Sequence, residues 1–272
     1  MFANRLIVAF AAILVLGVYL TYQVDSAYFY LIIIGLVLTV SAYVLSPQIN
    51  WWWWQRNPPD LPQKMIQLLE SRHPFYNRLS PEKKREFRRR MFLFIEGTNY
   101  MPKVMDSVPY DGKVMLATAP VSIGLKEEEF LFHQFENVIV YPQPFPSPQF
   151  PKQFHISEIF EPDGVMMFSM EHLIHGYVDP KQYLNPAWYE YAKVFQRTYP
   201  AYDYGDWSGT NWETLENISG FSQAALHKWF GLEQLELRAM GISFYFLFPA
   251  TFQQQLPALF NQLETVFSYH KH

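Results

Sequence analysis

Two uncharged apolar runs at the start of the chain constrain its fold most strongly. The first is LIVAFAAILVLGVYLTYQV, residues 6–24, and the second is AYFYLIIIGLVLTVSAYVL, residues 27–45. Each is long enough to cross the roughly 30 Å hydrocarbon core of a bilayer as a helix. Because the connecting residues QVDS allow only a tight turn, we expect a transmembrane helical hairpin over residues 1–50. A cleaved signal peptide is the alternative, but it has a shorter apolar region and no second span behind it.

The basic residues predict the orientation of this hairpin. Arg5 precedes the first run, and the turn carries no Lys or Arg. Arg56, Lys64 and the stretch KKREFRRR at 83–90 all follow the second run. Since positive residues stay on the cytoplasmic side of a membrane, we expect both ends of the hairpin inside the cell. The expected location is therefore a bacterial inner (cytoplasmic) membrane, with the membrane as a partner and the soluble domain facing the cytoplasm.

Residues 51–60 are expected to form an interfacial segment and a linker. Four tryptophans, Trp51 to Trp54, come directly after the second apolar run. Indole rings favour the headgroup layer, where the ring is half buried and its N–H is hydrated. The proline-containing stretch QRNPPDLP that follows reads as the linker to the rest of the chain.

Composition excludes several classes of function. The net charge is −4, so the chain offers no broad basic face for phosphate contacts, and we expect no nucleic-acid partner. There are no cysteines, which excludes disulfides, thiolate metal sites and cysteine nucleophiles. Charged residues make up only 17% of the chain, as expected if part of it lies in a membrane.

Residues 61–272 are expected to form one soluble domain. The stretch LSPEKKREFRRRMFLFIEG predicts its best-marked helix, with Ser80 as N-cap, Pro81 at the first position and Gly97 as the stop. Four apolar residues of this helix share one face: Phe87, Met91, Phe94 and Ile95.

The remaining elements are predicted more coarsely. VMLATAPVSIGL at 114–125 favours a buried helix, although periodicity alone leaves a strand open. Further helices are expected over MEHLIHGY, over PAWYEYAKVFQRTY and near the C-terminus, where Pro257 should break the helix. Short strands are expected at NVIVY and HISEIF, and the prolines of PQPFPSPQFPKQF exclude regular structure between them.

Two polar or aromatic segments leave alternatives open. Residues 203–220 are polar and rich in turn-forming residues, so they are expected to form an exposed loop. Aromatic residues concentrate at 184–212. They line either a contact surface, where Tyr and Trp are favoured, or the core of the domain.

The segment MEHLIHG at 170–176 raises the question of a metal site. A zinc peptidase of the zincin type has His-Glu-x-x-His on one helix, whereas this chain has Glu171-His172-x-x-His175. Residues three or four apart on a helix share a face, so Glu171 and His175, or the two histidines, could hold one metal ion. The alternative is two partly buried, hydrogen-bonded histidines on a helix whose other residues are apolar: Met166, Met167, Phe168, Leu173 and Ile174.

Taken in order, these segments resemble the Mlc titration factor A (MtfA) family of zinc-dependent peptidases. The similar segments are LSPEKKREFRRRMFLFIEG, VMLATAPVSIGL, VIVYPQPF, EHLIH, NPAWYEYAKVF and FPATFQQQLPALFNQLETVF, which cover most of 75–272 but not the hairpin. The resemblance implies an α+β, mainly helical, zincin-like soluble domain with a small sheet. It also implies zinc as cofactor, bound by His-Glu-x-x-His and a later glutamate, and aminopeptidase activity.

The chain departs from the family pattern at three of four functional positions. By resemblance, Glu171 stands at the first histidine ligand, His172 at the catalytic glutamate and His175 at the second histidine ligand. The segment ELRAMGISFYFLFP fits the later part of the pattern without a gap, and it places Ser243 at the third ligand position. His175 alone keeps its identity.

The chemistry of these departures favours a degenerate site. A catalytic zinc needs three protein ligands and an open position, and a neutral serine hydroxyl is a poor third ligand. His172 has a suitable ordinary pKa for a base, but an imidazole beside a metal ion tends to bind it. We therefore expect a membrane-anchored pseudopeptidase that binds a protein or peptide and holds no zinc.

An active zinc-dependent (amino)peptidase with unusual ligands is the alternative. In that case Glu171 and His175 bind zinc, His172 is catalytic, and an acid from the 203–216 segment completes the site: Asp203, Asp206, Glu213 or Glu216.

Overall fold

The computed structural model describes residues 1–267. The chain divides into two compact units, Met1–Pro59 and Asp60–His272, and each is described by itself. Residues 268–272, the end of the domain expected at 61–272, lie outside the described part.

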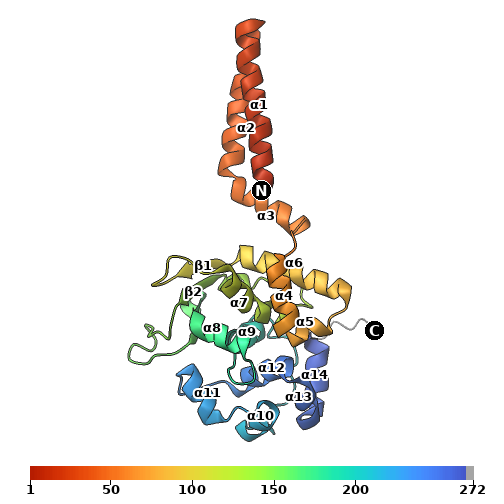
Figure 1. Cartoon of the computed structure of the whole chain (residues 1–272), viewed down its shortest axis with the longest axis vertical. Helices are drawn as coiled ribbons and strands as arrows, with labels where there is room; N and C mark the ends of the chain where they lie inside the picture. Colours follow the sequence, from red (N-terminus) through yellow and green to blue (C-terminus); the bar gives the residue numbers. More distant parts are fainter. Residues whose placement is uncertain (268–272) are drawn as a thin grey trace. The chain divides into compact units, whose positions relative to one another are not determined.

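The first unit is built around a pair of apolar helices. Helices α1 (Phe2–Gln23) and α2 (Phe29–Val44) run antiparallel, side by side, and a short 3-10 turn, η1 (Ser26–Tyr28), joins them (Figure 1). A Cβ atom at Gly35 would lie 2.6 Å from the backbone nitrogen of Leu14, so the helices approach closely where side chains are absent. Both helical stretches, Phe2–Gln23 and Ser26–Val44, are long and apolar enough to cross a membrane.

The four tryptophans lie in a third helix of this unit, α3 (Ser46–Arg56). The ring of Trp53 stacks on Phe2, with centroids 4.2 Å apart. The buried side chain of Asn50 accepts a hydrogen bond from the backbone N–H of Ala3 at 2.9 Å. These two contacts hold α3 against the start of α1, which explains why the chain stays helical through the tryptophans.

The second unit is mainly helical with one small sheet, as expected for an α+β domain. Its helices are α4 (Gln63–Arg72), α5 (Pro74–Arg78), α6 (Pro81–Gly97), α7 (Tyr110–Ile123), α8 (Met170–Val178), α9 (Pro186–Thr198), α10 (Trp212–Ser219), α11 (Gln223–Phe230), α12 (Leu237–Leu247), α13 (Pro249–Gln255) and α14 (Pro257–Phe267). Its strands are β1 (Asn99–Pro102), β2 (Asn137–Tyr141), β3 (Ser157–Phe160) and β4 (Val165–Ser169).

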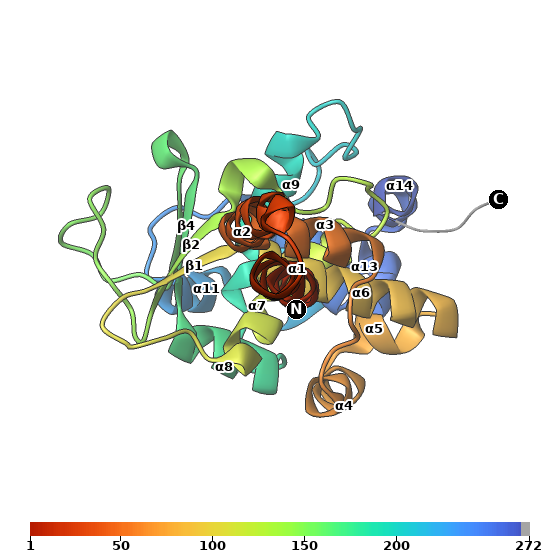
Figure 2. The same cartoon turned by 90° about the horizontal axis from the view of Figure 1, so that it is seen from above.

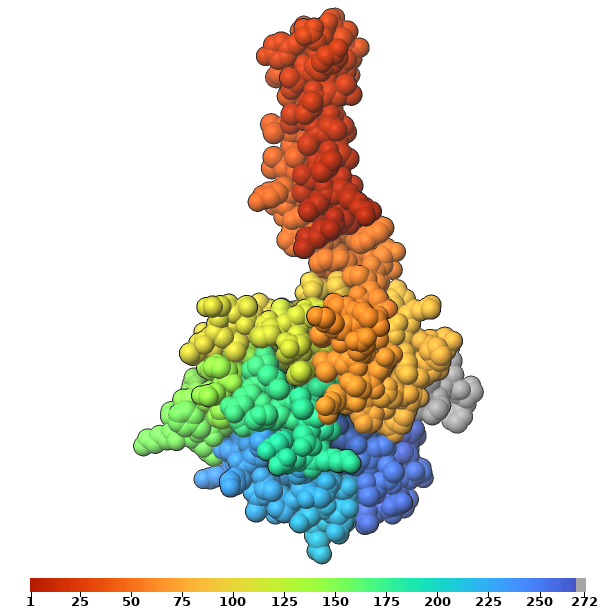
Figure 3. All heavy atoms as spheres, viewed as in Figure 1, coloured from red at the N-terminus to blue at the C-terminus, as the bar shows by residue number. Residues whose placement is uncertain are grey.

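The sheet is mixed, with strand order β1-β2-β4-β3. Strands β1, β2 and β4 are parallel, and Figure 2 shows them side by side, while β3 pairs antiparallel with β4. Helices α7, α8 and α9 contact one another, and α9 also contacts β3 and α12. Segments far apart in sequence therefore meet, and Figure 3 shows the middle third of the chain (green) directly beside the last third (blue).

Several predicted elements are confirmed. In α6 the side chain of Ser80 accepts a hydrogen bond from the N–H of Lys83, and the predicted apolar face is buried. Helix α7 is buried along almost its whole length, so the segment expected at 114–125 is a core helix. Strands β2 and β3 and helices α8 and α9 form where they were predicted. The C-terminal helix breaks before Pro257: α13 ends at Gln255 with Leu256 as its C-cap, and Pro257 starts α14.

Two local predictions were wrong. Met166, Met167 and Phe168 lie in strand β4, not on the helix of the two histidines, because β4 pairs with β2 on one side and β3 on the other. Residues 203–220 are not all loop, since 212–219 form α10. There the side chain of Asn211 accepts from the N–H of Thr214 at 2.9 Å, and two apolar side chains, Leu215 and Ile218, are buried.

Candidate functional site

The altered zinc motif lies where strand β4 passes directly into helix α8. The hydroxyl of Ser169, the last residue of β4, lies 2.9 Å from Nδ1 of His172 on the first turn of the helix. Further along α8, a Cβ atom at Gly176 would lie 2.3 Å from the backbone of Asn185. The helix is thus held closely between the sheet and the start of α9, which fixes the direction of its side chains.

His172 sits in a partly dehydrated position. Its side chain is half-buried, and burial lowers the pKa of its imidazole below the usual 6.5. The carboxylate of Glu171 opposes this effect, while His175 adds to it. The neutral imidazole, hydrogen bonded to Ser169, is therefore the favoured form at neutral pH.

The two histidines belong to a group of four rings in contact. We call His172, His175, Tyr183 and Trp229 the aromatic cluster. The indole of Trp229 lies 4.5 Å from the ring of His172 and 4.7 Å from that of Tyr183, centroid to centroid. His175 stacks on Tyr183 at 5.3 Å. The Trp229 N–H donates to the carbonyl of Leu184 at 2.8 Å, which anchors the indole in this position.

Four side chains on α8 differ in their exposure. Glu171 is half-buried, and His175 is exposed. Two large apolar residues on the same helix are also open to solvent: Ile174 is 39% exposed and Val178 is 42% exposed. Because these apolar residues are four positions apart, they share one face of α8. The helix therefore presents apolar groups outward beside the altered motif.

Ser243 lies in the interior of the domain, on α12. Its side chain is fully buried, and its hydroxyl donates a hydrogen bond to the carbonyl of Ala239 at 2.9 Å. This is the usual way in which a serine satisfies its hydroxyl within its own helix. Its one donor is thus used inside α12.

Two of the four acids of the 203–216 segment serve local turns, while Glu213 and Glu216 lie on α10. Asp203 accepts from the N–H of Gly205, and Asp206 accepts from the N–H of Ser208, both at 2.9 Å. The same segment packs on the C-terminal helices, since a Cβ atom at Gly205 would lie 2.6 Å from the side chain of Leu259. Within residues 1–267, no three His, Asp or Glu side chains gather as they would around a metal ion.

The aromatic residues of 184–195 belong to the core. Trp188, Tyr189, Tyr191 and Phe195 are all buried, so this part of the segment is not a contact surface. The physical reason is that α9 lies between α7, α12 and β3, and each side of the helix meets another element.

Sequence reasoning missed Ser169, Tyr183 and Trp229 as neighbours of the histidines. No spacing pattern connects Trp229 with His172, because they come from separate helices that meet only in the folded domain. Ser169 had a local signal, since a serine three residues before a histidine at a helix start can reach its ring.

Comparison with known proteins gives one match. Residues 49–192 match the model of a protein family described as glucose-regulated metallo-peptidase M90. No curated protein and no solved structure matches the chain significantly. The matched range starts inside α3, includes Glu171, His172 and His175, and ends before Ser243.

Proposed function

Because the chain belongs to the glucose-regulated metallo-peptidase M90 family, we propose that it is a membrane-anchored pseudopeptidase. In this proposal the domain has lost the catalytic zinc site and binds a protein or peptide instead. The proposed function rests on two separate features. One is the set of side chains that stand at the zinc-ligand positions, and the other is the surface that α8 presents.

The loss of the zinc site is argued from the side chains that would have to bind the metal ion. A catalytic zinc needs three protein ligands and an open position. The motif supplies Glu171, His172 and His175, and the third ligand position expected from the resemblance is Ser243, whose buried hydroxyl already bonds to Ala239. These residues do not fit a catalytic zinc site, so we derive no catalytic step through zinc. This donor set is the observation that carries the proposal.

The position expected for the general base supports the same conclusion. Nδ1 of His172 is hydrogen bonded to the hydroxyl of Ser169, and the indole of Trp229 packs against its ring at a tilt of 51°. A base that activates water needs free access to that water. An aromatic ring at 4.5 Å limits this access.

The exposed side chains of α8 support a binding role. Tyr and Trp are frequent in binding hot spots, and exposed apolar groups beside them are typical of interaction sites. Ile174 and Val178 supply exposed apolar groups next to the exposed His175. Tyr183 and Trp229, both half-buried and outside α8, contact the two histidines. A peptide that docks here would bury apolar side chains against α8.

The two apolar helices of the first unit support anchoring in a membrane. Their lengths and hydropathy suit transmembrane spans, and the basic residues after them favour a cytoplasmic position for the second unit. We propose the bacterial inner membrane as the location, with zinc absent from the working protein.

A metal and activity assay tests the proposal. The full chain, purified in detergent micelles without chelators, should contain far less than one zinc per chain and should not cleave unblocked peptides. Stoichiometric zinc, together with peptide cleavage that His175→Ala abolishes, would show that the protein is an active peptidase with unusual ligands. The matched control is the double substitution Glu171→His and His172→Glu, which restores the His-Glu-x-x-His order on α8 without a buried carboxylate at Ser243, and it should raise the zinc content.

A further inference from the structure

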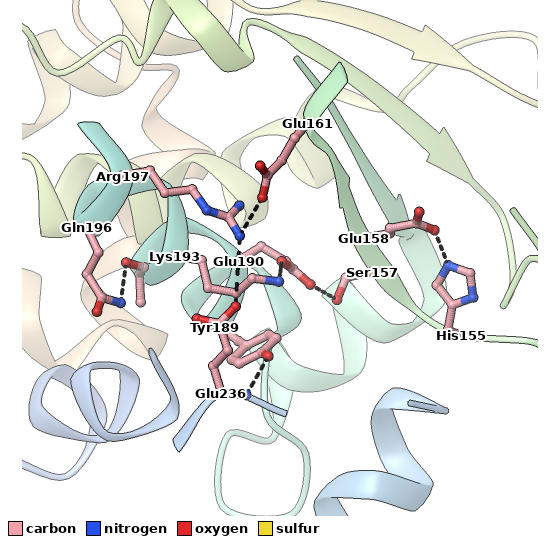
Figure 4. A network of polar contacts seen from close by, with 11 residues as sticks. His155, Ser157, Glu158, Glu161, Tyr189, Glu190, Lys193, Gln196, Arg197 and Glu236 are labelled. Atoms are coloured by element: carbon pink, nitrogen blue, oxygen red, sulfur yellow. Dashed lines mark hydrogen bonds and ion pairs between the residues drawn. The ribbon is translucent and has the colours of Figure 1, made fainter. Parts of the chain in front are cut away.

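Two cavities of the second unit differ in whether their positive charges are already paired within the chain. One lies between strand β3, helix α9 and residues 232–236. There the buried carboxylate of Glu190 accepts from the hydroxyl of Ser157 at 2.8 Å and from the ammonium of Lys193 at 3.0 Å (Figure 4). Lys193 is the only Lys or Arg among the described residues that line this cavity, so no positive charge is left there for a ligand. The other cavity lies beside the end of α8, and its positive charges are unpaired.

This second cavity, which we call the α8 pocket, is small and mainly apolar. It lies where the ends of α4, α8 and α12 meet the starts of α5 and α9, and its volume is about 160 Å³. Whole small ligands occupy pockets of about 300–1,000 Å³, so this one has room for a single side chain. No member of the aromatic cluster lines it. Its apolar walls include Pro74, Tyr177, Trp188, Leu247 and Phe248.

Two exposed basic side chains also line the α8 pocket. They are Arg72, the last residue of α4, and Lys181, in the connection between α8 and α9. One nitrogen of the Arg72 guanidinium, Nη1, donates to the carbonyl of Val178 at 2.9 Å. This bond fixes the guanidinium beside α8 and leaves its other N–H groups available. Within residues 1–267, neither cation forms an ion pair with an Asp or Glu.

No acidic side chain compensates these two cations inside the pocket. The described residues that line it include no Asp or Glu, and the exposed Asp179 close by in the chain is not among them. His73 lines the pocket but stays neutral at pH 7, because burial lowers its pKa to about 3. Burial also raises the pKa of Tyr177, so its phenol is neutral too. The charge of the pocket therefore favours an anionic occupant with an apolar part.

We propose that the α8 pocket binds the C-terminal residue of a peptide, with an apolar side chain inside and the α-carboxylate bound by Arg72 and Lys181. A C-terminal residue carries both groups on one Cα atom, which matches a pocket for one side chain with cations in its lining. An internal acidic residue fits less well, because side chains alternate in direction along an extended peptide and its apolar neighbour points away. Guanidinium binds carboxylate through two parallel N–H bonds, and capture of a C-terminal carboxylate is a recurring mode of peptide recognition.

The α8 pocket adjoins the surface already proposed for binding. Tyr177 belongs to α8, and the carbonyl that accepts from Arg72 is that of Val178, an exposed apolar residue of that surface. Peptide residues before the C-terminus can then contact Val178 and Ile174. The inference rests on the proposed function, because it names which end of a bound peptide the domain recognises.

Calorimetric titration of the full chain, in micelles of an uncharged detergent, tests the proposal. The probes are the acetylated peptide Ac-Gly-Ser-Ala-Leu with a free C-terminal carboxylate and the same peptide with a C-terminal amide. The acetyl group blocks cleavage from the N-terminus. The free acid should bind at least tenfold more tightly than the amide. The free acid Ac-Gly-Ser-Ala-Ser, which lacks the apolar side chain, should bind at least fivefold more weakly than the leucine acid.

Arg72→Gln and Lys181→Gln should each weaken binding of the leucine acid at least fivefold and change binding of the amide less than twofold. Lys181→Gln alters an exposed side chain, so it tests the site without disturbing the core. The matched control is Lys64→Gln, which removes the same charge from the other end of α4, outside the pocket lining, and should change binding less than twofold.

Equal binding of acid and amide, no binding of either, or equal effects of Lys64→Gln and Lys181→Gln would overturn the inference. Binding of N-acetylleucine as tight as that of the leucine acid would show that a small free acid is the occupant instead of a peptide. Failure of the inference differs from failure of the proposed function. If acid and amide bind equally and Val178→Asp abolishes both, the surface of α8 binds peptides without recognising their C-terminus, whereas stoichiometric zinc with peptide cleavage refutes the proposed function itself.

Discussion

The indole of Trp229 packs against the imidazole of His172, with the ring centroids 4.5 Å apart and the ring planes tilted by 51°. The two residues lie on different helices, α11 and α8, and the indole is anchored through its N–H to the carbonyl of Leu184. This contact both dehydrates the histidine and supplies part of an aromatic surface at the altered motif. It therefore connects the loss of catalytic geometry with the proposed binding role.

Removing this indole should change both stability and proton affinity. Trp229→Ala exposes the His172 ring, so the pKa of His172 should rise toward 6.5, because burial is the main cause of its lowering. The half-buried indole should also contribute about 2 kcal/mol to the free energy of unfolding, roughly half of the cost of a core Trp→Ala change. NMR titration of the His172 ring and urea denaturation measure the two effects. Trp212→Ala, a half-buried tryptophan on α10, should leave the pKa of His172 unchanged.

The buried His73 should make stability depend on pH. Burial lowers the pKa of His73 from 6.5 to about 3, and the nearby Arg78 acts in the same direction. Between these values the unfolded chain binds a proton that the folded chain does not bind. The free energy of unfolding should therefore fall as the pH drops from 6.5 toward 3, by about 1.4 kcal/mol per pH unit.

His73→Phe should reduce this dependence by about one proton. A phenyl ring fits among the neighbouring rings of Phe87 and Trp188, and Ser122 keeps its hydrogen bond to the carbonyl of Thr118. Denaturation of the wild-type and variant chains at pH 7.0, 5.5 and 4.5 checks the effect. The same slope in both proteins would show that other groups cause the acid sensitivity.

Ser243→Ala should be nearly neutral. Among the described residues the hydroxyl of Ser243 bonds only to the carbonyl of Ala239, within the same helix, so its loss should change the free energy of unfolding by less than about 1 kcal/mol. Ser243→Glu, by contrast, buries a carboxylate and should cost several kcal/mol. Chemical denaturation of both variants distinguishes the two. A large loss in Ser243→Ala would mean that the hydroxyl holds another group.

Gly176 should not tolerate a side chain. A Cβ atom there would lie 2.3 Å from the backbone of Asn185, so α8 and the start of α9 must separate. Gly176→Ala should lower the free energy of unfolding by about 2 kcal/mol or more. Gly209→Ala is the matched control, since nothing lies within 4 Å of its Cβ atom, and its effect should stay within about 0.5 kcal/mol. Similar effects of the two changes would contradict the close approach of the backbones.

The absence of cysteines allows a clean test of topology. Asp25→Cys, in the turn between α1 and α2, should react with a membrane-impermeant maleimide in spheroplasts. Lys228→Cys, exposed on α11, should react only after the inner membrane is permeabilised. Labelling is read by mass shift on a gel. Labelling of Lys228→Cys in intact spheroplasts would place the domain outside the cytoplasm and refute the proposed orientation.

Local sequence patterns accounted for several of the helices. Ser80 and Pro81 mark the start of α6 because a serine side chain and a proline ring suit a helix N-terminus whatever surrounds it. The sequence signals for the motif helix α8 and for the helix break at Pro257 were equally local. The mainly helical α+β class followed from these signals together with the resemblance to zinc-dependent peptidases.

Local sequence patterns failed where strand pairing or the burial of side chains decided the secondary structure. Met166 to Phe168 are apolar and adjoin a helix, and only their hydrogen bonds to β2 and β3 make them a strand. Helix α10 is short, and its stability depends on burying Leu215 and Ile218 against other helices. Neither contact can be read from neighbouring residues.

The sequence alone determined which residues stand at the four functional positions: Glu171, His172, His175 and Ser243. It therefore also determined the argument against a catalytic zinc ion. Only the tertiary structure decided what surrounds them: Trp229 packs against His172, and the hydroxyl of Ser243 bonds within its own helix. The reason is physical. Helix signals act over a few residues of chain, whereas hydration, charge and free acceptors depend on atoms that come from distant parts of the sequence.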